Sequence, residues 1–113
     1  MTIEEYVIAY LGDALSIPVS GNVPHQMPER FVTVELTGSS MSNYIPSARL
    51  SIECWGTSRS DSAQLYTDVA AAMLSMTNDS AISRVELETG YNDADMNTNR
   101  PRYTATFSVV YLF

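Results

Sequence analysis

The sequence predicts an α+β domain in which two helices pack on one face of a mostly antiparallel sheet of four to five strands. Two observations support this prediction. Apolar residues recur at helical spacing over residues 3–15 and 63–74, and apolar and polar residues alternate over residues 31–36, 48–55 and 103–113. The resulting order is helix, strand, strand, helix, strand, strand. One largely antiparallel sheet with both helices on the same side is the simplest way to arrange such elements.

The first helix begins with a capping box. Thr2 is followed three residues later by Glu5, a pattern in which the side chain of each residue caps the backbone of the other. The helix is predicted to end before Pro18, because proline lacks an amide donor and disfavours helical geometry at Ile17. The prolines that follow allow only a short edge strand within residues 17–23.

The strand at residues 48–55 and the helix that follows it are predicted to form the centre of the fold. Leu50, Ile52 and Cys54 share one face of this strand. Serine residues directly after the strand can cap the helix. The helix carries an apolar stripe that can cover the strand, formed by Ala63, Tyr66, Val69, Ala70, Met73 and Leu74.

The other strands are assigned from the same alternation. In residues 31–36 the predicted outward side chains are Phe31, Thr33 and Glu35, and the predicted inward ones are Val32, Val34 and Leu36. In residues 82–88 we expect Val85 and Leu87 to face inward. The predicted buried core consists of Leu50, Ile52, Val69, Met73, Val85, Phe107 and Val109.

Two segments, residues 38–47 and 89–99, are predicted to be long loops. The first is rich in serine but also contains Met41 and Tyr44, which nothing nearby in the sequence would cover. Hairpin connections usually have two to five residues. The two side chains therefore either fold back onto the domain or wait for a partner chain. In the second case the loop is expected to be mobile in the free subunit and ordered in an assembly.

Composition indicates a single acidic domain covering residues 1–113. The chain has thirteen acidic residues, six arginines and no lysine, which gives a net charge of −7. Such a chain is not expected to bind DNA or an anionic membrane by bulk attraction. The sequence contains no apolar run near 18 residues and no secretory signal pattern, so no membrane span is predicted.

The residues that usually carry chemistry do not form a catalytic or metal-binding pattern. The only histidine, His25, is in a loop, and the only cysteine, Cys54, is on the apolar face of a strand. Residues 92–99 alternate oxygen ligands as a calcium loop does, but they lack its glycine at position six and its glutamate at position twelve. We therefore predict no enzymatic activity, no cofactor and no metal site, and we interpret this stretch as a polar loop.

Three segments resemble those of a known family. The first is Val23-Pro24, then Met-Pro-Glu-Arg-Phe-Val-Thr-Val-Glu at residues 27–35, then Thr37-Gly38. The second is Glu-Cys-Trp-Gly at residues 53–56, followed by Ser58-Arg59 and an alanine-rich helix. The third is Gly90-Tyr91, an Asp/Asn-rich loop, and Arg-Pro-Arg-Tyr at residues 100–103 leading into the last strand. Together they resemble the small tail terminator (tail completion) proteins of long-tailed bacteriophages and prophages, over about residues 19–113.

The resemblance implies an α+β subunit, without enzymatic activity or cofactor, that forms a homohexameric ring. The ring would cap the phage tail tube, end its growth and form part of the head–tail joining interface. Its partners would be other copies of the chain, the tail tube protein and a head–tail connector protein, and DNA would pass through it without specific binding. Its expected location is the head-proximal end of the tail in the virion, and the host cytoplasm during assembly.

The residues expected at subunit or partner contacts share a place in or beside a predicted loop. Arginines are included because a planar guanidinium binds carboxylates well, and acidic residues are expected to outnumber arginines on the lumen of a ring. The candidates are Arg30, Met41, Tyr44, Arg59, Asp93, Asp95 and Arg102. Three alternatives remain open: another head–tail connector or minor structural protein, a non-viral interaction domain, and a calcium-binding domain that uses residues 92–99.

Overall fold

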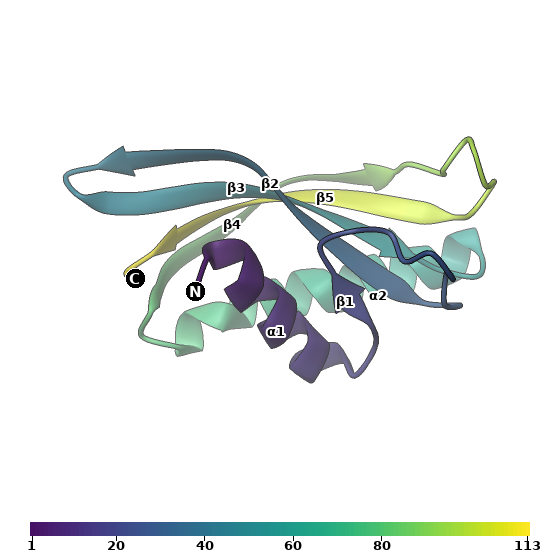
Figure 1. Ribbon diagram of the computed structural model, residues 1–113, viewed down its shortest axis with the longest axis horizontal. Coiled ribbons are helices and arrows are strands. Elements are labelled where there is room, and N and C mark those ends of the chain that lie inside the picture. Colours follow the sequence, from purple (N-terminus) through teal and green to yellow (C-terminus); the bar gives the residue numbers. More distant parts are fainter.

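A computed structural model describes all 113 residues and shows one five-stranded sheet with two helices on one of its faces (Figure 1). This arrangement confirms the predicted α+β class. The helices are α1 (Ile3–Leu15) and α2 (Arg59–Ser75), which a short 3-10 helix, η1 (Met76–Asn78), extends. The strands are β1 (Val19–Ser20), β2 (Phe31–Ser42), β3 (Ile45–Trp55), β4 (Ile82–Asn92) and β5 (Arg102–Tyr111).

The strands lie in the order β1-β2-β3-β5-β4. All neighbours are antiparallel except β1, which pairs in parallel with β2 at Val32 and Thr33 only. Leu50 on β3 lies opposite Leu36 on β2 and Phe107 on β5, so β3 and β5 form the middle of the sheet. β2 and β4 are consequently the two long outer strands, and the predicted edge strand at residues 17–23 is reduced to the two residues of β1.

Both helices begin at the caps that the sequence predicts. The hydroxyl of Thr2 accepts a hydrogen bond from the amide of Glu5, whose carboxylate in turn accepts from the Thr2 amide, each at 3.1 Å. At α2 the hydroxyl of Ser58 accepts from the amide of Asp61 at 3.0 Å. Caps of this kind satisfy amide groups that the first helical turn leaves without partners.

The core lies between the helical layer and the sheet. Six of the seven predicted core residues are buried, and Val85 packs half-buried at the margin of the core. The stripe on α2 differs from the prediction, because Leu65 is buried whereas 49% of Leu74 is exposed. The buried residues of α2 and η1 follow the spacing Ser62, Leu65, Val69, Met73 and Met76, and the predicted Ala63, Tyr66 and Ala70 border this line.

The face of the sheet opposite the helices, here called the open face, is partly covered by its own side chains. Phe31 points toward this face as predicted, yet it is fully buried. Its ring stacks on Trp55 with 5.1 Å between centroids, and the guanidinium of Arg100 lies 5.7 Å from its ring centre. Thr33, the next residue on this face, is also buried, so alternation gave the correct direction of both side chains but not their burial.

The first predicted long loop is mostly strand, and the second is strand only at its start. Residues 38–47 continue β2 to Ser42 and start β3 at Ile45, so only Asn43 and Tyr44 connect the two strands. Both turn residues have positive φ, 52° and 65°, as in the two-residue type I′ turns that suit the twist of a hairpin. β4 likewise extends to Asn92, beyond the predicted start of a loop at residue 89. Glycine, asparagine and proline are depleted in strands, so cross-strand pairing determines the conformation of the first segment.

The sheet is longer than the helices that cover it. α1 and α2 have 13 and 17 residues, or roughly 20 and 26 Å, whereas the 12 residues of β2 span roughly 40 Å. The longest dimension of the molecule is 43 Å. The end of the β2–β3 hairpin therefore extends past the helical layer, as Figure 1 shows.

The position of Phe107 in the core gives a first testable prediction. Phe107→Ala should lower the free energy of unfolding by about 3–5 kcal/mol, because the ring is fully buried between the sheet and α2. Leu112→Ala is the matched control, since 58% of Leu112 is exposed, and it should change stability by less than about 0.5 kcal/mol. Denaturant unfolding measures both, and an unchanged midpoint for Phe107→Ala would contradict the assigned core.

Candidate interaction surfaces

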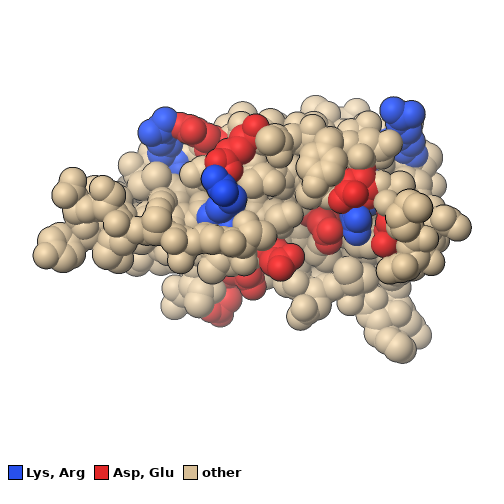
Figure 2. Space-filling model, turned by 90° about the horizontal axis from the view of Figure 1, so that it is seen from above, with Lys and Arg blue, Asp and Glu red and all other residues tan.

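The end of the β2–β3 hairpin is the most exposed apolar part of the chain. The exposed fractions are 65% for Met41, 94% for Tyr44 and 45% for Ile45. Residues 37–48 contain no charged residue, although the chain carries −7 overall. In Figure 2 the narrow projecting end of the molecule accordingly has no red or blue atoms. The structure therefore places Met41 on a paired strand and Tyr44 in the two-residue turn of a projecting β-hairpin, instead of in a long loop.

Tyr44 adopts a backbone conformation that disfavours its side chain. Its φ of 65° lies in the left-handed region, where an L-residue is less stable than glycine by roughly 1–2 kcal/mol. The preceding Asn43 tolerates this region well, and glycine is the usual residue at the second position of such a turn. A bulky aromatic residue that is held in this conformation and almost fully exposed suggests a role outside the stability of the single chain.

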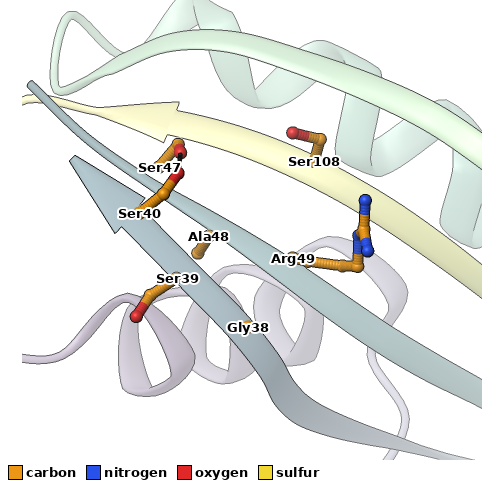
Figure 3. Close-up of a pocket in the computed structure, with 7 residues that line it drawn as sticks. All are labelled: Gly38, Ser39, Ser40, Ser47, Ala48, Arg49 and Ser108. Carbon is orange, nitrogen blue, oxygen red and sulfur yellow. Dashed lines mark hydrogen bonds between the residues drawn. The ribbon is translucent and has the colours of Figure 1, made fainter. Parts of the chain in front are cut away.

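A shallow hollow of about 280 Å³ runs along the open face of the hairpin (Figure 3). It is lined by four serines, an arginine, a glycine and an alanine and by no large apolar side chain, and the hydroxyls of Ser40 and Ser47 lie 2.7 Å apart across the two strands. Arg49 borders the hollow but holds the carboxylate of Glu88 through two hydrogen bonds of 2.9 and 3.3 Å. Small-molecule sites are usually concave and apolar with a few polar groups, so this hollow does not have the character of one.

Arg102 organises the other end of the open face. Its guanidinium lies 3.3 Å from Glu53, 3.1 Å from Asp93 and 4.0 Å from Asp95, and only 16% of its side chain is exposed. It also lies 4.9 Å from the ring centre of Trp55. Three of the predicted contact residues, Asp93, Asp95 and Arg102, are thus brought together, and they bind one another within the chain.

Arg100 joins the loop at residues 93–101 to the segment before β2. One of its terminal nitrogens donates to the backbone carbonyls of Pro28, Glu29 and Gly56 at 3.1, 2.9 and 3.4 Å. The partners of this guanidinium are backbone carbonyls, which every residue has, and not carboxylates. The sequence alone therefore could not indicate this role of Arg100.

The other two candidate arginines lie at the N-terminus of α2. The Nε atom of Arg30 is 3.1 Å from Oδ1 of Asp61, and Oδ2 of the same carboxylate accepts from the amide of Thr57 at 2.9 Å. Arg59 is the first residue of α2, is exposed, and has no carboxylate within ion-pair distance. Of the three arginines predicted at subunit contacts, only Arg59 therefore lacks a partner inside the chain.

The residues that could carry chemistry lie apart from one another. Cys54 is buried, and burial raises the pKa of its thiol to about 12, so little thiolate forms at neutral pH. His25 is exposed in the loop before β2. Asp95 accepts hydrogen bonds from the amide and hydroxyl of Thr98, and these bonds lower its pKa. The structure contains no group of three or more His, Cys, Asp or Glu residues arranged to hold a metal ion.

Comparison with known protein families gave no matching family model, and comparison with curated proteins gave no significant match. None of the helices is both long and apolar enough to cross a membrane.

The Asp61 contacts predict how stability depends on acid. The hydrogen bond from the Thr57 backbone, with that from its hydroxyl and the charge of Arg30, holds the pKa of Asp61 below the usual 3.8. A carboxylate with a lowered pKa stabilises the fold above its unfolded pKa, and this contribution is lost as the pH falls through the folded value. The loss of stability below about pH 3.8 should therefore be smaller in Asp61→Asn than in the wild type. Thermal unfolding between pH 2 and 6 measures this, and equal acid sensitivity in the two proteins would contradict it.

Proposed function

We propose that this chain is a structural, non-enzymatic subunit that assembles into a ring on the end of a bacteriophage tail tube. The ring ends tube growth and forms part of the surface to which the filled head binds. The observation that carries the proposal is the uncharged, apolar-tipped hairpin that projects from an otherwise acidic domain. The sequence resemblance to tail terminator proteins supports it, because that family also consists of small α+β subunits.

The hairpin has the properties of a contact element for another protein. Aromatic and sulfur-containing side chains are enriched at protein interfaces, whereas charged residues are depleted from their centres. Tyr44, Met41 and Ile45 provide such side chains, and residues 37–48 provide the uncharged surroundings. The two strands of the hairpin pair within the single chain, and pairing that forms before binding would reduce the entropy lost on association.

The charge of the domain suits a ring through which DNA passes. Six copies, each with a net charge of −7, would carry −42 formal charges. A wall with few cations makes few phosphate contacts, and phosphate contacts provide most non-specific DNA affinity. Four arginines already bind carboxylates within the chain, which leaves little positive charge to face a lumen.

The proposal is tested by tail length in cells that assemble the phage. Deleting the gene should give tails of variable and excessive length in negative-stain electron micrographs, and supplying the chain in trans should restore one uniform length. His25→Ala should restore length as well as the wild type does, because the proposal gives His25 no catalytic role. Normal tails in the deletion strain, or a well-folded His25→Ala chain that fails to restore them, would contradict the proposed function.

A substitution at Tyr44 should affect the stability of the chain and its assembly differently. Tyr44→Gly should maintain or raise the melting temperature, because glycine adopts the left-handed turn without the penalty of a side chain. The same change should abolish restoration of tail length, because it removes the most exposed aromatic side chain of the hairpin.

Tyr44→Phe is the matched control, since it keeps the ring and the strained turn. It should retain both wild-type stability and most of the activity. A Tyr44→Gly chain that is fully active would show that the hairpin tip is not a contact element.

A further inference from the structure

The sheet has two free outer edges on opposite sides of the molecule. β1 covers β2 only at Val32 and Thr33, and the amide of Leu36 donates to the carboxylate of Glu4 at 2.9 Å. Beyond Leu36 no strand lies beside β2. β4 has no neighbour on its outer side along its whole length, Ile82–Asn92. Unpaired strand edges of this kind are templates for pairing with another chain.

The register identifies the backbone groups that β2 presents at its free edge. Ser42 and Ile45 flank the two-residue turn, so they exchange both of their ladder hydrogen bonds. Because the ladder alternates, Ser40 also bonds to β3, whereas Ser39 and Met41 direct their amide and carbonyl groups outward. This edge carries neither charge nor proline, which are the usual means of preventing edge pairing.

The outward groups of β4 follow in the same way. The amide of Asp93 donates to the carbonyl of Arg102, and the amide of Leu112 donates to the carbonyl of Ala81. Along an antiparallel pair, hydrogen-bonded and non-hydrogen-bonded residue pairs alternate, and each bulge inserts one extra residue. When the pairs are followed inward from these two bonds, Val85 and Leu87 fall at non-hydrogen-bonded positions, so their amide and carbonyl groups point outward.

Two features make the free edges of β2 and β4 complementary. β3 and β5 lie between these strands and every pairing is antiparallel, so β4 runs antiparallel to β2. A second copy displaced along the sheet without turning over would therefore present its β4 antiparallel to β2, with its helices on the same side. The charges of β4 are already compensated, because Arg84 pairs with Glu86, and Glu88 with Arg49. The neutral edge of β2 would thus bury no unpaired charge beside β4.

Apolar side chains support the same pairing. Leu36 lies opposite Leu50, and Leu87 opposite Phe107, so both point to the helix-covered face of the sheet. They are nevertheless 40% and 37% exposed, because the helices do not reach the margins of the sheet. Met41 lies on the same face as Ala48, since its partner Pro46 is two residues away on β3. Pairing of the two edges would cover these side chains with one another.

We infer that copies of this chain join by strand addition, the outer edge of β2 beyond Leu36 binding the outer edge of β4 of the next copy. This inference rests on the proposed ring and specifies how its subunits meet. When each subunit uses two unlike surfaces on its opposite sides, the assembly is a closed ring if the rotations from one subunit to the next add up to a full turn. Main-chain hydrogen bonds then provide the affinity, as in other cases of strand addition.

The test blocks one edge at a time. Ser39→Pro removes an outward amide of β2 and leaves the pairing with β3 intact, and Leu87→Pro does the same for β4. Ser39→Ala and Leu87→Val keep the amides and are the matched controls. Sedimentation velocity should show assemblies larger than a dimer for the wild type and both controls, and monomers for each proline variant alone.

Mixing the two proline variants should give a 1:1 heterodimer that grows no further, because each chain keeps one working edge that fits the other's. Circular dichroism and thermal melting verify folding, and Met41→Pro replaces Ser39→Pro if that variant unfolds.

The inference is overturned if either proline variant assembles like the wild type or if the mixture does not pair. It is also overturned if Leu87→Pro forms homodimers through β2, or if the wild type is monomeric at about 1 mM, a concentration at which interfaces of only about −4 kcal/mol are populated. The proposed function fails separately, through the tail-length assay.

Discussion

The mismatch between a short helical layer and a long sheet determines which parts of this molecule are available to partners. The apolar face of the sheet is covered where α2 packs against β3, β4 and β5 and α1 packs against β1 and β2, and there Leu50, Ile52 and Phe107 are fully buried. Beyond the helices the strands continue and are held by backbone pairing and by the contact between the hydroxyls of Ser40 and Ser47. The composition changes at the same point, because residues 37–48 are small, uncharged or apolar. In the proposed assembly, the covered length of these strands provides stability and the uncovered length provides the contacts with partners.

Arginine side chains hold the groups of the open face in place, and the chain contains no lysine. Arg102 and Arg100 each bind several acceptors, and Arg49 binds both oxygens of one carboxylate. A planar guanidinium can satisfy acceptors in several directions while it stacks on an aromatic ring, which an ammonium group does less well. These contacts connect the loop at residues 93–101 to the middle of the sheet. The acidic surface therefore consists partly of carboxylates held in place and not only of solvated ones.

Periodicity in the sequence predicted the fold class, the first helix and six buried residues of the seven named as core, because alternation and helical spacing report directly on which side chains face a common layer. It did not predict the burial of Leu65, Met76 or Ile82. It failed where partners distant in sequence decide the outcome. The burial of Phe31 depends on Trp55 and Arg100, and the long hairpin depends on pairing between serine-rich strands that have weak preferences of their own. Met41 and Tyr44 could be chosen as contact candidates from the sequence because no neighbouring segment would cover them, and both are exposed in the structure. The internal partners of Arg30 and Arg102 could be seen only in three dimensions.

The separation of a neutral hairpin from an acidic body has a kinetic consequence. Free copies repel one another at long range, so they meet less often in dilute salt and more often as the Debye length shortens toward about 8 Å at physiological ionic strength. The contacts of the hairpin itself involve no charge, and the lifetime of a completed contact should therefore depend little on salt. Association would then be slow between free subunits and faster wherever a growing structure holds several of them close together. Electrostatic repulsion would thus slow the association of free subunits and lower their equilibrium affinity by the same factor, without shortening the lifetime of a completed contact.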